Sequence, residues 1–474
     1  MARTVVVSNR IGPIEEGTAT AGGLTVGVYE ILRVTGGLWL GWSGEIAGRT
    51  SSRPNTKIRN NITYATIALG RRDYAEYYAG FANSTLWPLL HFRTGLIDFN
   101  RDWLTGYLRV NDLISKCLHP LLQPDDVIWV HDYHLIPLGA ALRRLGVRQR
   151  IGFFLHTPLP PRAVLHTLPS QNLLFGTLSA YDLVGFQTAT DVEHFVDYMV
   201  RELGASANDA TLAVDTRIFR TGVFPIGIDP AAFAGVAAAS FGQSATRRLV
   251  KSLGDRRLII GVDRLDYSKG LPLRLRAIDR LLDCHPDWRG RFTFLQVAPL
   301  SRTDVRQYGQ LRAELEAAAG NINGRFADCD WTPIRYVNRN VGRNTLAGYF
   351  RHAAVGLVTP LRDGMNLVAK EYIAAQRPED PGVLVLSQFA GAAGELDAAL
   401  LVNPFDVDGI VEAIIRALEM PLLERRARWR TMMTSLQENT VGDWARRFID
   451  TLASPRGDVR PPPVAAIGDE LATL

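Results

Sequence analysis

The sequence predicts an α/β protein with two domains, each built on a parallel sheet. The chain has 474 residues, which is long for a single core and suits two domains of ordinary size. Short apolar, β-branched runs alternate with amphipathic stretches of helix length. The runs are continuous rather than alternating, as in strands that are buried on both faces of a parallel sheet. Because this strand–helix alternation comes in two successive blocks, it favours two α/β domains.

The strands of the two blocks can be placed from these apolar runs. In the first block we expect strands at 4–7, 127–130, 151–155, 182–186 and 223–226. In the second block we expect strands at 257–262, 292–297, 333–337, 354–358, 383–386 and 399–402.

The boundary between the blocks is expected in the stretch 228–246, which is rich in small residues and has no strand pattern. The predicted domains are therefore 1–229 and 230–453. An amphipathic helix at about 442–453 ends the second domain, and we expect it to pack back on the first. The segment 454–474 contains three consecutive prolines, which cannot form a helix or a central strand, and is predicted to be an irregular tail.

Composition excludes several classes of protein. The formal net charge is +5, with 53 basic and 48 acidic residues, an excess too small to predict nucleic-acid binding but compatible with a local anion pocket. The three cysteines lie far apart without CxxC spacing, which argues against disulfides and structural zinc and fits a reducing cytoplasm. The first residues lack the pattern of a signal peptide, and no apolar run reaches the length of a membrane span, so a cytoplasmic protein is expected.

Polar residues follow almost every predicted strand. Arg10 comes after the first strand, His131-Asp132 after the second and His156 after the third, while Arg302 and the stretch 359–366 follow strands of the second block. In open parallel sheets, ligands bind outside the carboxyl ends of the strands. We therefore expect two sheets that face one another across a central cleft lined by these residues.

Arg264 and Lys269 lie five residues apart in "DRLDYSKG", directly after a strand. A fixed guanidinium and a mobile ammonium suit a diphosphate, although the pattern alone fits a solvated surface pair equally well. Gly22-Gly23 would let the backbone approach a ligand closely, but the stretch 19–27 lacks the full GxGxxG and P-loop patterns.

A metal site is not expected. His131 and His134 at a strand end have poor geometry for one metal, and a third ligand is missing nearby. His156 stands before a Pro-rich turn, which favours a positioned site residue over a core histidine. The aromatic residues before the cleft either pack in the core or stack against a sugar; they are Trp39, Trp42, Tyr77, Tyr78 and Trp87.

Several long motifs resemble one known family, the trehalose-6-phosphate synthases, which are retaining glycosyltransferases of the GT-B type with two Rossmann-like domains. The resemblance runs from about residue 3 to 450 and leaves out the tail. The motifs are "VVVSNR", "AGGL", "GGLWLGWSGE", "EYYAGFANSTLWPLLH", "HDYHL", "GFFLHTPLPP", "DLVGFQT", "PIGID", "DRLDYSKGL", "TPLRDGMNLVAKEY" and "VLVLSQFAGAA".

The resemblance implies an activity: transfer of glucose from a nucleoside diphosphate glucose to glucose 6-phosphate with retention, giving trehalose 6-phosphate. UDP-glucose is the expected donor. Small residues at Val341-Gly342, where some relatives carry larger ones, leave GDP- and ADP-glucose open. The resemblance further implies no metal, a homo-oligomer, and a separate trehalose-6-phosphate phosphatase that acts on the product.

The resemblance also implies roles for individual residues. The acceptor phosphate would be held by Arg10, Tyr78 and Arg302, and the acceptor sugar would be lined by Trp42, Trp87 and Asp132. The donor would be held by Gly23, Arg264, Lys269, Leu346, Asp363, Gly364, Met365, Asn366, Leu367, Val368 and Glu371. The catalytic set would be His156 beside the 6-hydroxyl of the transferred glucose, Asp363 against that sugar, and Arg264 and Lys269 on the diphosphate.

The sequence argues against three alternative functions. A pseudo-glycosyltransferase that joins cyclitol units would change the acceptor and donor-sugar contacts, which are intact here. An inactive regulatory homologue would show broken donor residues or an appended phosphatase domain. A sugar phosphorylase would need a lysine that anchors pyridoxal phosphate, and no such lysine is evident.

Overall fold

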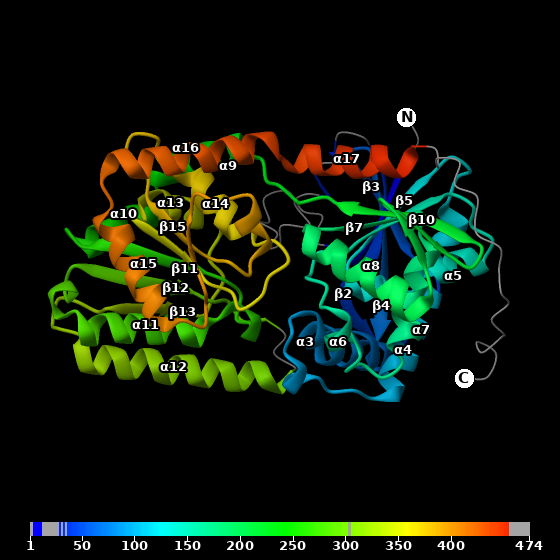
Figure 1. Cartoon of the computed structure of the whole chain (residues 1–474), viewed down its shortest axis with the longest axis horizontal. Coiled ribbons are helices and arrows are strands. Elements are labelled where there is room, and N and C mark those ends of the chain that lie inside the picture. Colours follow the sequence, from blue (N-terminus) through cyan, green and yellow to red (C-terminus); the bar gives the residue numbers. More distant parts are fainter. Residues whose placement is uncertain (1–2, 12–27, 30–31, 34–35, 302–304, 455–474) are drawn as a thin grey trace. The chain divides into compact units, whose positions relative to one another are not determined.

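A computed structural model of the chain describes residues 3–11, 28–29, 32–33, 36–301 and 305–454. It divides into two compact units (Figure 1). The first unit takes in the chain up to Ile11, then Leu32–Phe224, and the stretch from Arg446 onward. The second unit contains Pro225–Ala445. In the described part of the chain, none of the helices combines the length and apolarity needed to cross a bilayer.

The described residues of the first unit contain a ten-stranded sheet in the order β3-β4-β2-β1-β5-β6-β7-β10-β9-β8. Along this order, the seven strands from β4 through β2, β1, β5, β6 and β7 to β10 run parallel to one another. Antiparallel strands close both edges of the sheet. The bounds are β1 Thr4–Arg10, β2 Gly37–Ala47, β3 Asn55–Arg59, β4 Ile62–Gly70, β5 Val127–His131, β6 Arg150–Phe154, β7 Leu183–Phe186, β8 Ser206–Asn208, β9 Thr211–Val214 and β10 Arg217–Val223.

Four of the five strands predicted for this block are present. The prediction of a strand at 223–226 is wrong, because β10 ends at Val223 and Pro225, which has no N–H to donate, follows outside the sheet. Strands β2 and β4 were not among the predicted strands, although both lie inside the sheet. Most of β4 is buried, and so is the stretch Leu38–Trp42 of β2.

The helices of the first unit pack on this sheet. Their bounds are α2 Arg71–Asp73, η1 Tyr74–Leu86, α3 Trp87–Leu90, η2 Thr94–Leu96, α4 Arg101–Leu118, η3 His119–Leu121, η4 Tyr133–Leu135, α5 Leu138–Arg144, α6 Arg162–Leu165, α7 Gln171–Phe175, η5 Gly176–Ala180 and α8 Ala189–Leu203. The stretch η1 is π-helical over its whole length, a conformation that is rare and frequent at functional sites.

The C-terminal half of α17 (Val441–Ala453) packs on this sheet (Figure 1). The ring of Phe448 stacks on Trp129 with centroids 4.7 Å apart. It occupies space left by Gly152 and Gly185, since a Cβ on either glycine would lie 2.7 Å from the Phe448 ring. The two glycines in β6 and β7 are therefore required by the approach of this helix.

Within its described residues, the second unit has a six-stranded, all-parallel sheet in the order β13-β12-β11-β14-β15-β16. The bounds are β11 Arg257–Val262, β12 Phe292–Val297, β13 Ile334–Val337, β14 Val355–Val358, β15 Val383–Ser387 and β16 Leu400–Val402. All six strands lie where the apolar runs predicted them.

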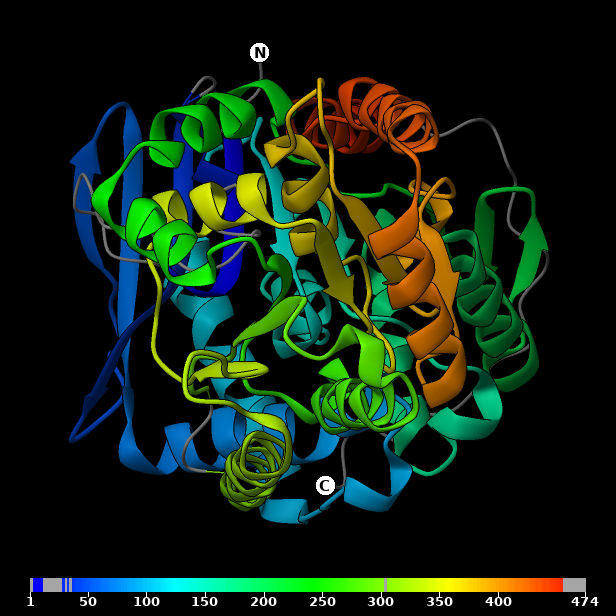
Figure 2. The same cartoon turned by 90° about the vertical axis from the view of Figure 1, so that its left-hand side faces the viewer.

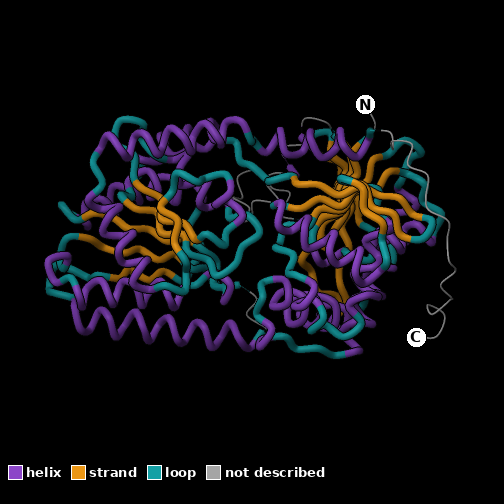
Figure 3. The backbone as a smooth tube through the Cα atoms, in the orientation of Figure 1, coloured by secondary structure: helices purple, strands orange, loops and turns teal. Residues whose placement is uncertain are grey.

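Helices cover both faces of this second sheet (Figures 2 and 3). Their bounds are α9 Pro230–Phe241, α10 Ser244–Leu253, η6 Tyr267–Lys269, α11 Leu271–Cys284, η7 Pro286–Trp288, α12 Arg306–Phe326, α13 Arg343–His352, α14 Leu367–Ala375, η8 Gly391–Gly394, α15 Val407–Glu419 and α16 Leu422–Glu438. On one face α11 packs against α12 and α15, and on the other α9 packs against α13 and α14. The strand ends that carry the predicted donor residues therefore emerge from a rigid, doubly covered sheet.

Candidate active site

In the first unit, Arg10 lies at the end of β1 beside Trp42 of β2. The two residues are partners in the strand register, and the guanidinium carbon lies 5.4 Å from the centre of the indole ring. Gly44, at φ +90°, leaves room for this arginine, because a Cβ there would lie 2.6 Å from Nη2 of Arg10. Arg10 is exposed, so its charge is held over an aromatic face and remains open to an anion.

The π-helical stretch η1 brings Tyr78 to the same place. The rings of Tyr78 and Trp42 have centroids 5.2 Å apart, and Tyr78 also stacks on His134 at 5.9 Å. Trp42 and Trp87 are both largely buried, at 4% and 5% exposed. The ring of Trp87 packs closely against His91 and Tyr133. Arg10, Trp42 and Tyr78 thus form one cluster, and Trp87 belongs mainly to the core beside it.

Asp132 has a strained backbone directly after β5. Its φ is +75°, in a region that residues other than glycine rarely adopt and that is common at functional sites. Its N–H donates to the Phe154 carbonyl at 2.8 Å. Its carboxylate accepts the N–H of His156 at 3.3 Å. The strained turn therefore joins the ends of β5 and β6.

His156 is paired with His131. Nε2 of His156 lies 3.1 Å from Nδ1 of His131, so one ring must donate a proton to the other. Burial lowers the pKa of His156 from 6.5 to about 3. Burial, together with the neighbouring His156, also lowers the pKa of His131 well below its ordinary value. Both rings are consequently neutral at physiological pH, and His156 can donate or accept a hydrogen bond without carrying charge.

In the second unit, Lys269 and Asp363 form an ion pair between the loops after β11 and β14. The ammonium nitrogen lies 2.6 Å from Oδ2 of Asp363, and the two side chains are 11% and 15% exposed. The interpretation of Lys269 as a mobile ammonium is therefore wrong: the lysine is buried and held by the acid. The sequence separates the two residues by 94 positions, so their contact could not be read from it.

Asn366 fixes the start of α14. Its side chain caps the helix by accepting the N–H of Ala369 at 3.1 Å. Its amide nitrogen donates to Oδ2 of Asp363 at 2.9 Å. The backbone of Asn366 is left-handed, with φ +83°. The helix N-terminus, which favours anions, thus lies next to the Lys269–Asp363 pair.

The segment 389–392 supports the same loop from the side. The N–H of Asp363 donates to Phe389, that of Gly391 to Asp363, and that of Ala392 to Met365. A Cβ on Gly391 would lie 1.9 Å from the Gly364 carbonyl oxygen, so only glycine fits there. The motif "QFAGAA" therefore holds the predicted donor loop in place.

Arg264 is more exposed than Lys269, with 42% of its side chain accessible. Its Nε lies 3.4 Å from Oδ2 of Asp266, which is fully buried. The same oxygen accepts the hydroxyl of Tyr308 at 3.2 Å. Asp266, which was not predicted, therefore anchors the guanidinium. Its position inside "DRLDYSKG" was the available signal.

Glu371 lies one turn into α14 with a quarter of its side chain exposed, 3.8 Å from Nε of Arg343. Burial raises the pKa of this carboxyl from 4.5 to about 7, against the opposing effect of Arg343. Leu346 is half-buried on α13, the helix that also carries Arg343.

The predicted residues Gly23 and Arg302 lie outside the described part of the chain. The described residues also contain no group of three histidine, cysteine or acidic side chains that could hold a metal ion.

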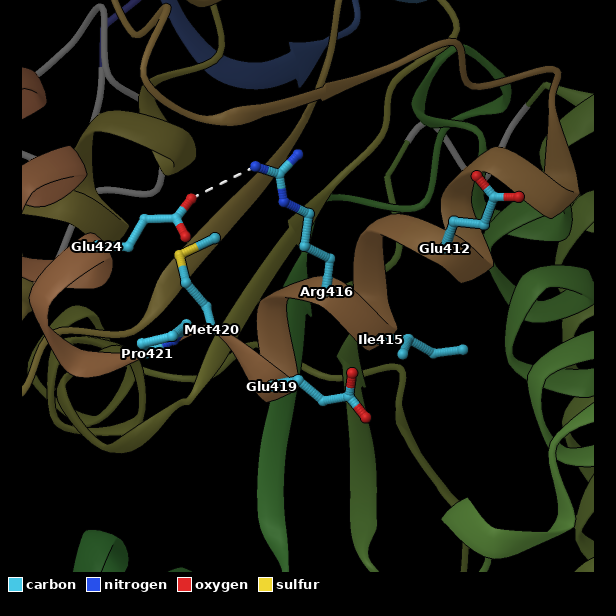
Figure 4. A pocket seen from close by; sticks show the side chains of 7 residues that line it. All are labelled: Glu412, Ile415, Arg416, Glu419, Met420, Pro421 and Glu424. Carbon is cyan, nitrogen blue, oxygen red and sulfur yellow. Dashed lines mark hydrogen bonds and ion pairs between the residues drawn. The ribbon is translucent and has the colours of Figure 1, made fainter.

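Two surface cavities lie in the second unit. One, of about 350 Å³, lies between α15 and α16, where Arg416 and Glu424 are paired (Figure 4). It is lined by Glu412, Ile415, Arg416, Glu419, Met420, Pro421 and Glu424, and contains none of the predicted residues. The other, of about 320 Å³, lies between the β12–β13 face and the helices α10 and α13, and its wall includes Val341.

Comparisons with known proteins agree with this architecture. The family model described as glycosyltransferase family 20 matches residues 5–454. The trehalose-6-phosphate synthase of Sinorhizobium fredii is 50% identical over 458 residues, which are 96% of this chain and 99% of that protein.

Two solved structures are similar over nearly the whole chain. An α,α-trehalose-phosphate synthase (UDP-forming) from Burkholderia xenovorans, in complex with glucose-6-phosphate, is 51% identical with a TM-score of 0.93 and covers 96% of this chain and 100% of its own. A protein from E. coli bound with UDP-2-fluoro glucose is 46% identical with a TM-score of 0.91, over 95% of this chain and 99% of its own. With this fold, these strand-end residues and this match, the chain belongs to glycosyltransferase family 20.

Proposed function

We propose that this transferase moves glucose from UDP-glucose to glucose 6-phosphate with retention of configuration, forming α,α-trehalose 6-phosphate and UDP. The observation that carries the proposal is the Lys269–Asp363 pair beside the N-terminus of α14. It combines a cation for a diphosphate, an acid for sugar hydroxyls and a helix end for an anion. The relatives solved with glucose-6-phosphate and with UDP-2-fluoro glucose support the same pair of substrates.

The second unit is proposed to bind the donor. Arg264 and Lys269 hold the diphosphate, and the backbone from Gly364 to Val368 meets the phosphate and sugar. Gly23 is proposed to approach the diphosphate as well.

At the other end of the donor, Glu371 takes the ribose hydroxyls and Leu346 meets the nucleoside. The cavity bordered by Val341 supports a place for the base on this side of α13. Its small wall residue also supports acceptance of GDP- or ADP-glucose beside UDP-glucose. Basic side chains and the helix dipole take the role that a metal plays in other diphosphate sites.

The first unit is proposed to bind the acceptor. Arg10, Tyr78 and Arg302 hold the phosphate of glucose 6-phosphate. Trp42 and Trp87 offer ring faces and edges to the sugar, and Asp132 accepts its hydroxyls. The strained backbone of Asp132, at a strand end, supports a functional role for this residue.

The proposed chemistry takes place on one face of the donor sugar. The bond from the anomeric carbon to the diphosphate oxygen breaks, and a bond from that carbon to the anomeric hydroxyl oxygen of the acceptor forms on the same side. The departing phosphate oxygen accepts the hydroxyl proton. The chain's residues stabilise the growing phosphate charge through Arg264 and Lys269, and hold the sugar through His156 and Asp363.

The proposal extends to the cellular compartment and the partners of the chain. Cys117, Cys284 and Cys329 are free thiols, which is compatible with the proposed reducing cytoplasm. We expect a homo-oligomer, and a separate trehalose-6-phosphate phosphatase that acts on the product.

The test is nucleotide release from UDP-, GDP- or ADP-glucose with and without glucose 6-phosphate. The proposal expects release that depends on the acceptor. Absence of acceptor-dependent release with all three donors would overturn it, and strict use of a single donor would overturn the permissive base site alone.

A further inference from the structure

A fully buried arginine lies beneath the two loops that carry Lys269 and Asp363. Arg274 is on the first turn of α11 and has no exposed surface. Its guanidinium donates to Oδ2 of Asp263 at 2.7 Å and to Oε1 of Gln296 at 2.9 Å. Burying such a charge is expensive unless its partners compensate fully, so this position calls for a physical reason.

The remaining contacts of Arg274 reach both donor loops. Its Nε donates to the Thr359 hydroxyl at 3.1 Å, and its Nη2 lies 3.4 Å from the Lys269 carbonyl oxygen. Thr359 follows β14, and Lys269 follows β11. One planar group with fixed donors therefore touches the backbone of one loop and a side chain of the other.

The junction above Arg274 is tightly packed. The N–H of Leu361 donates to the Ser268 carbonyl at 2.8 Å. At Gly270, with φ +68°, a Cβ would lie 2.3 Å from the Thr359 carbonyl oxygen, and at Gly261 a Cβ would lie 2.7 Å from Nη1 of Arg274. The loops thus meet directly over the guanidinium, with no space for a side chain between them.

We propose that Arg274 is a positioning residue that sets the register of the two donor loops, and so the place of the Lys269–Asp363 pair. The inference rests on the proposed function, since it assigns that pair to the donor. Arg274 contacts no substrate in this account. It acts through Lys269 by fixing that residue's carbonyl and the neighbouring Thr359 hydroxyl, while Gln296 is itself locked by donating to the Gly261 carbonyl at 3.2 Å.

Charge order in the network supports this role. Arg274 pairs with Asp263, and Lys269 pairs with Asp363. Lys269 and Asp363 are both close enough to act on the charge of Asp263. Positive and negative groups therefore alternate from the core to the site, which leaves Lys269 held between two acids and facing an incoming diphosphate.

The experiment is a double-mutant cycle on the full chain with Arg274→Lys and Lys269→Ala. Lysine keeps the charge but cannot serve four partners in a plane. We expect Arg274→Lys to lower kcat/KM for UDP-glucose by about 30-fold or more, in the range for misplacing a preorganised charge. The KM for glucose 6-phosphate should stay within about two-fold of its value, because the first unit is untouched.

The cycle separates positioning from a general structural role. In the Lys269→Ala background, Arg274→Lys should add less than about three-fold, because the group it positions is gone. Equal losses in both backgrounds, or equal changes in the KM of both substrates, would overturn the proposal. The matched control is Arg280→Lys, because Arg280 is an exposed arginine on the same helix. It should change neither kcat/KM for UDP-glucose nor the KM for glucose 6-phosphate.

Thr359→Val keeps the proposal testable if Arg274→Lys does not fold. It removes one of the four contacts and should give a smaller loss with the same dependence on Lys269. If the wild-type chain shows no transfer, the proposed function fails. The same double-mutant cycle is then measured with UDP affinity, by calorimetry, in place of kcat/KM. Additive losses of UDP affinity would then overturn the positioning role independently.

Discussion

Nζ of Lys269 lies 2.6 Å from Oδ2 of Asp363, across two loops that follow different strands of the second sheet. This contact explains how an acid can lie beside a proposed diphosphate site. The lysine compensates the carboxylate, and Asn366 donates to the same oxygen at 2.9 Å. Asp363 is thus held in one orientation by a lysine and an amide that both bind Oδ2.

Asp363→Asn tests the role of this acid. The amide can still accept from Lys269, so we expect UDP affinity to change by only a few-fold, while transfer falls by about 10²–10³ through loss of a preorganised charge at the reacting sugar. The measurements are UDP binding by calorimetry and kcat. Asp279→Asn, an acid on α11 paired with Arg325, is the control. Lost UDP affinity with unchanged transfer would contradict the assignment.

Arg10→Ala tests the acceptor site. The exposed guanidinium is held over Trp42 at 5.4 Å and is proposed to bind a phosphate. Loss of one charge-assisted hydrogen bond of about 1.5–3 kcal/mol should raise the KM for glucose 6-phosphate by about 10–100-fold. The KM for UDP-glucose should not change. A rise confined to the donor KM would show that Arg10 serves the other substrate.

His156 should not titrate in the working range. Its pKa of about 3 in the folded chain lies below the ordinary 6.5, so the ring is neutral in the folded state above about pH 4. Transfer should therefore show no ionisation of His156, visible as an unchanged ¹⁵N shift of its ring between about pH 5 and 8. His156→Ala should lower transfer by about ten-fold, as for a lost neutral hydrogen bond, and the exposed His119→Ala should not.

The same shift affects stability. Because the folded pKa is lower than the unfolded one, the unfolded chain binds more protons between about 3 and 6.5. The contribution of His156 to the free energy of unfolding is therefore complete above this range and is lost as the pH falls through it. A ring shift that titrates near 6.5 in the folded protein would contradict the burial of this histidine.

Glu371 should make donor binding depend on pH. Its pKa is raised to about 7, and the ionised form is the better acceptor for ribose hydroxyls. UDP-glucose, whose diphosphate does not ionise in this range, should bind more tightly as the pH rises through about 7. Glu371→Gln should remove that dependence, and an unchanged pH profile in this variant would refute the role.

The ionisation of Glu371 should affect the free energy of unfolding in the opposite direction to donor affinity. A raised pKa means that the folded chain binds the proton more tightly than the unfolded chain. The carboxyl therefore destabilises the fold progressively as the pH rises from 4.5 to about 7, and by a constant amount above that. Glu371→Gln should accordingly be more stable than the wild type at alkaline pH, as measured by denaturant unfolding.

The second sheet was predictable because its four inner strands, β11, β12, β14 and β15, are almost entirely buried and read as continuous apolar runs. In the first sheet, β2 mixes glycine and tryptophan with exposed polar residues after Trp42, so its run did not stand out. Strand β10 interrupts its apolar residues with two arginines, a threonine and a glycine, and only its last residue lay in the predicted range.

The sequence predicted which strand ends and motifs form the site, but not which of their side chains contact one another. A lysine after one strand and an aspartate after another carry no sign of their contact. Arg274 lies in "LPLRLRAIDRLL", where an arginine ordinarily faces solvent, and its burial depends on partners from three separate loops and strands. Contacts of this kind are set by the tertiary fold, which local pattern does not encode.

Transfer of glucose with retention to the anomeric hydroxyl of glucose 6-phosphate can be followed directly by ¹³C NMR. The reaction contains UDP-glucose labelled at its anomeric carbon and unlabelled glucose 6-phosphate. The label should appear in an α,α-linked disaccharide phosphate, with one UDP released per linkage. Label in free glucose, or in a β-linked product, would contradict it.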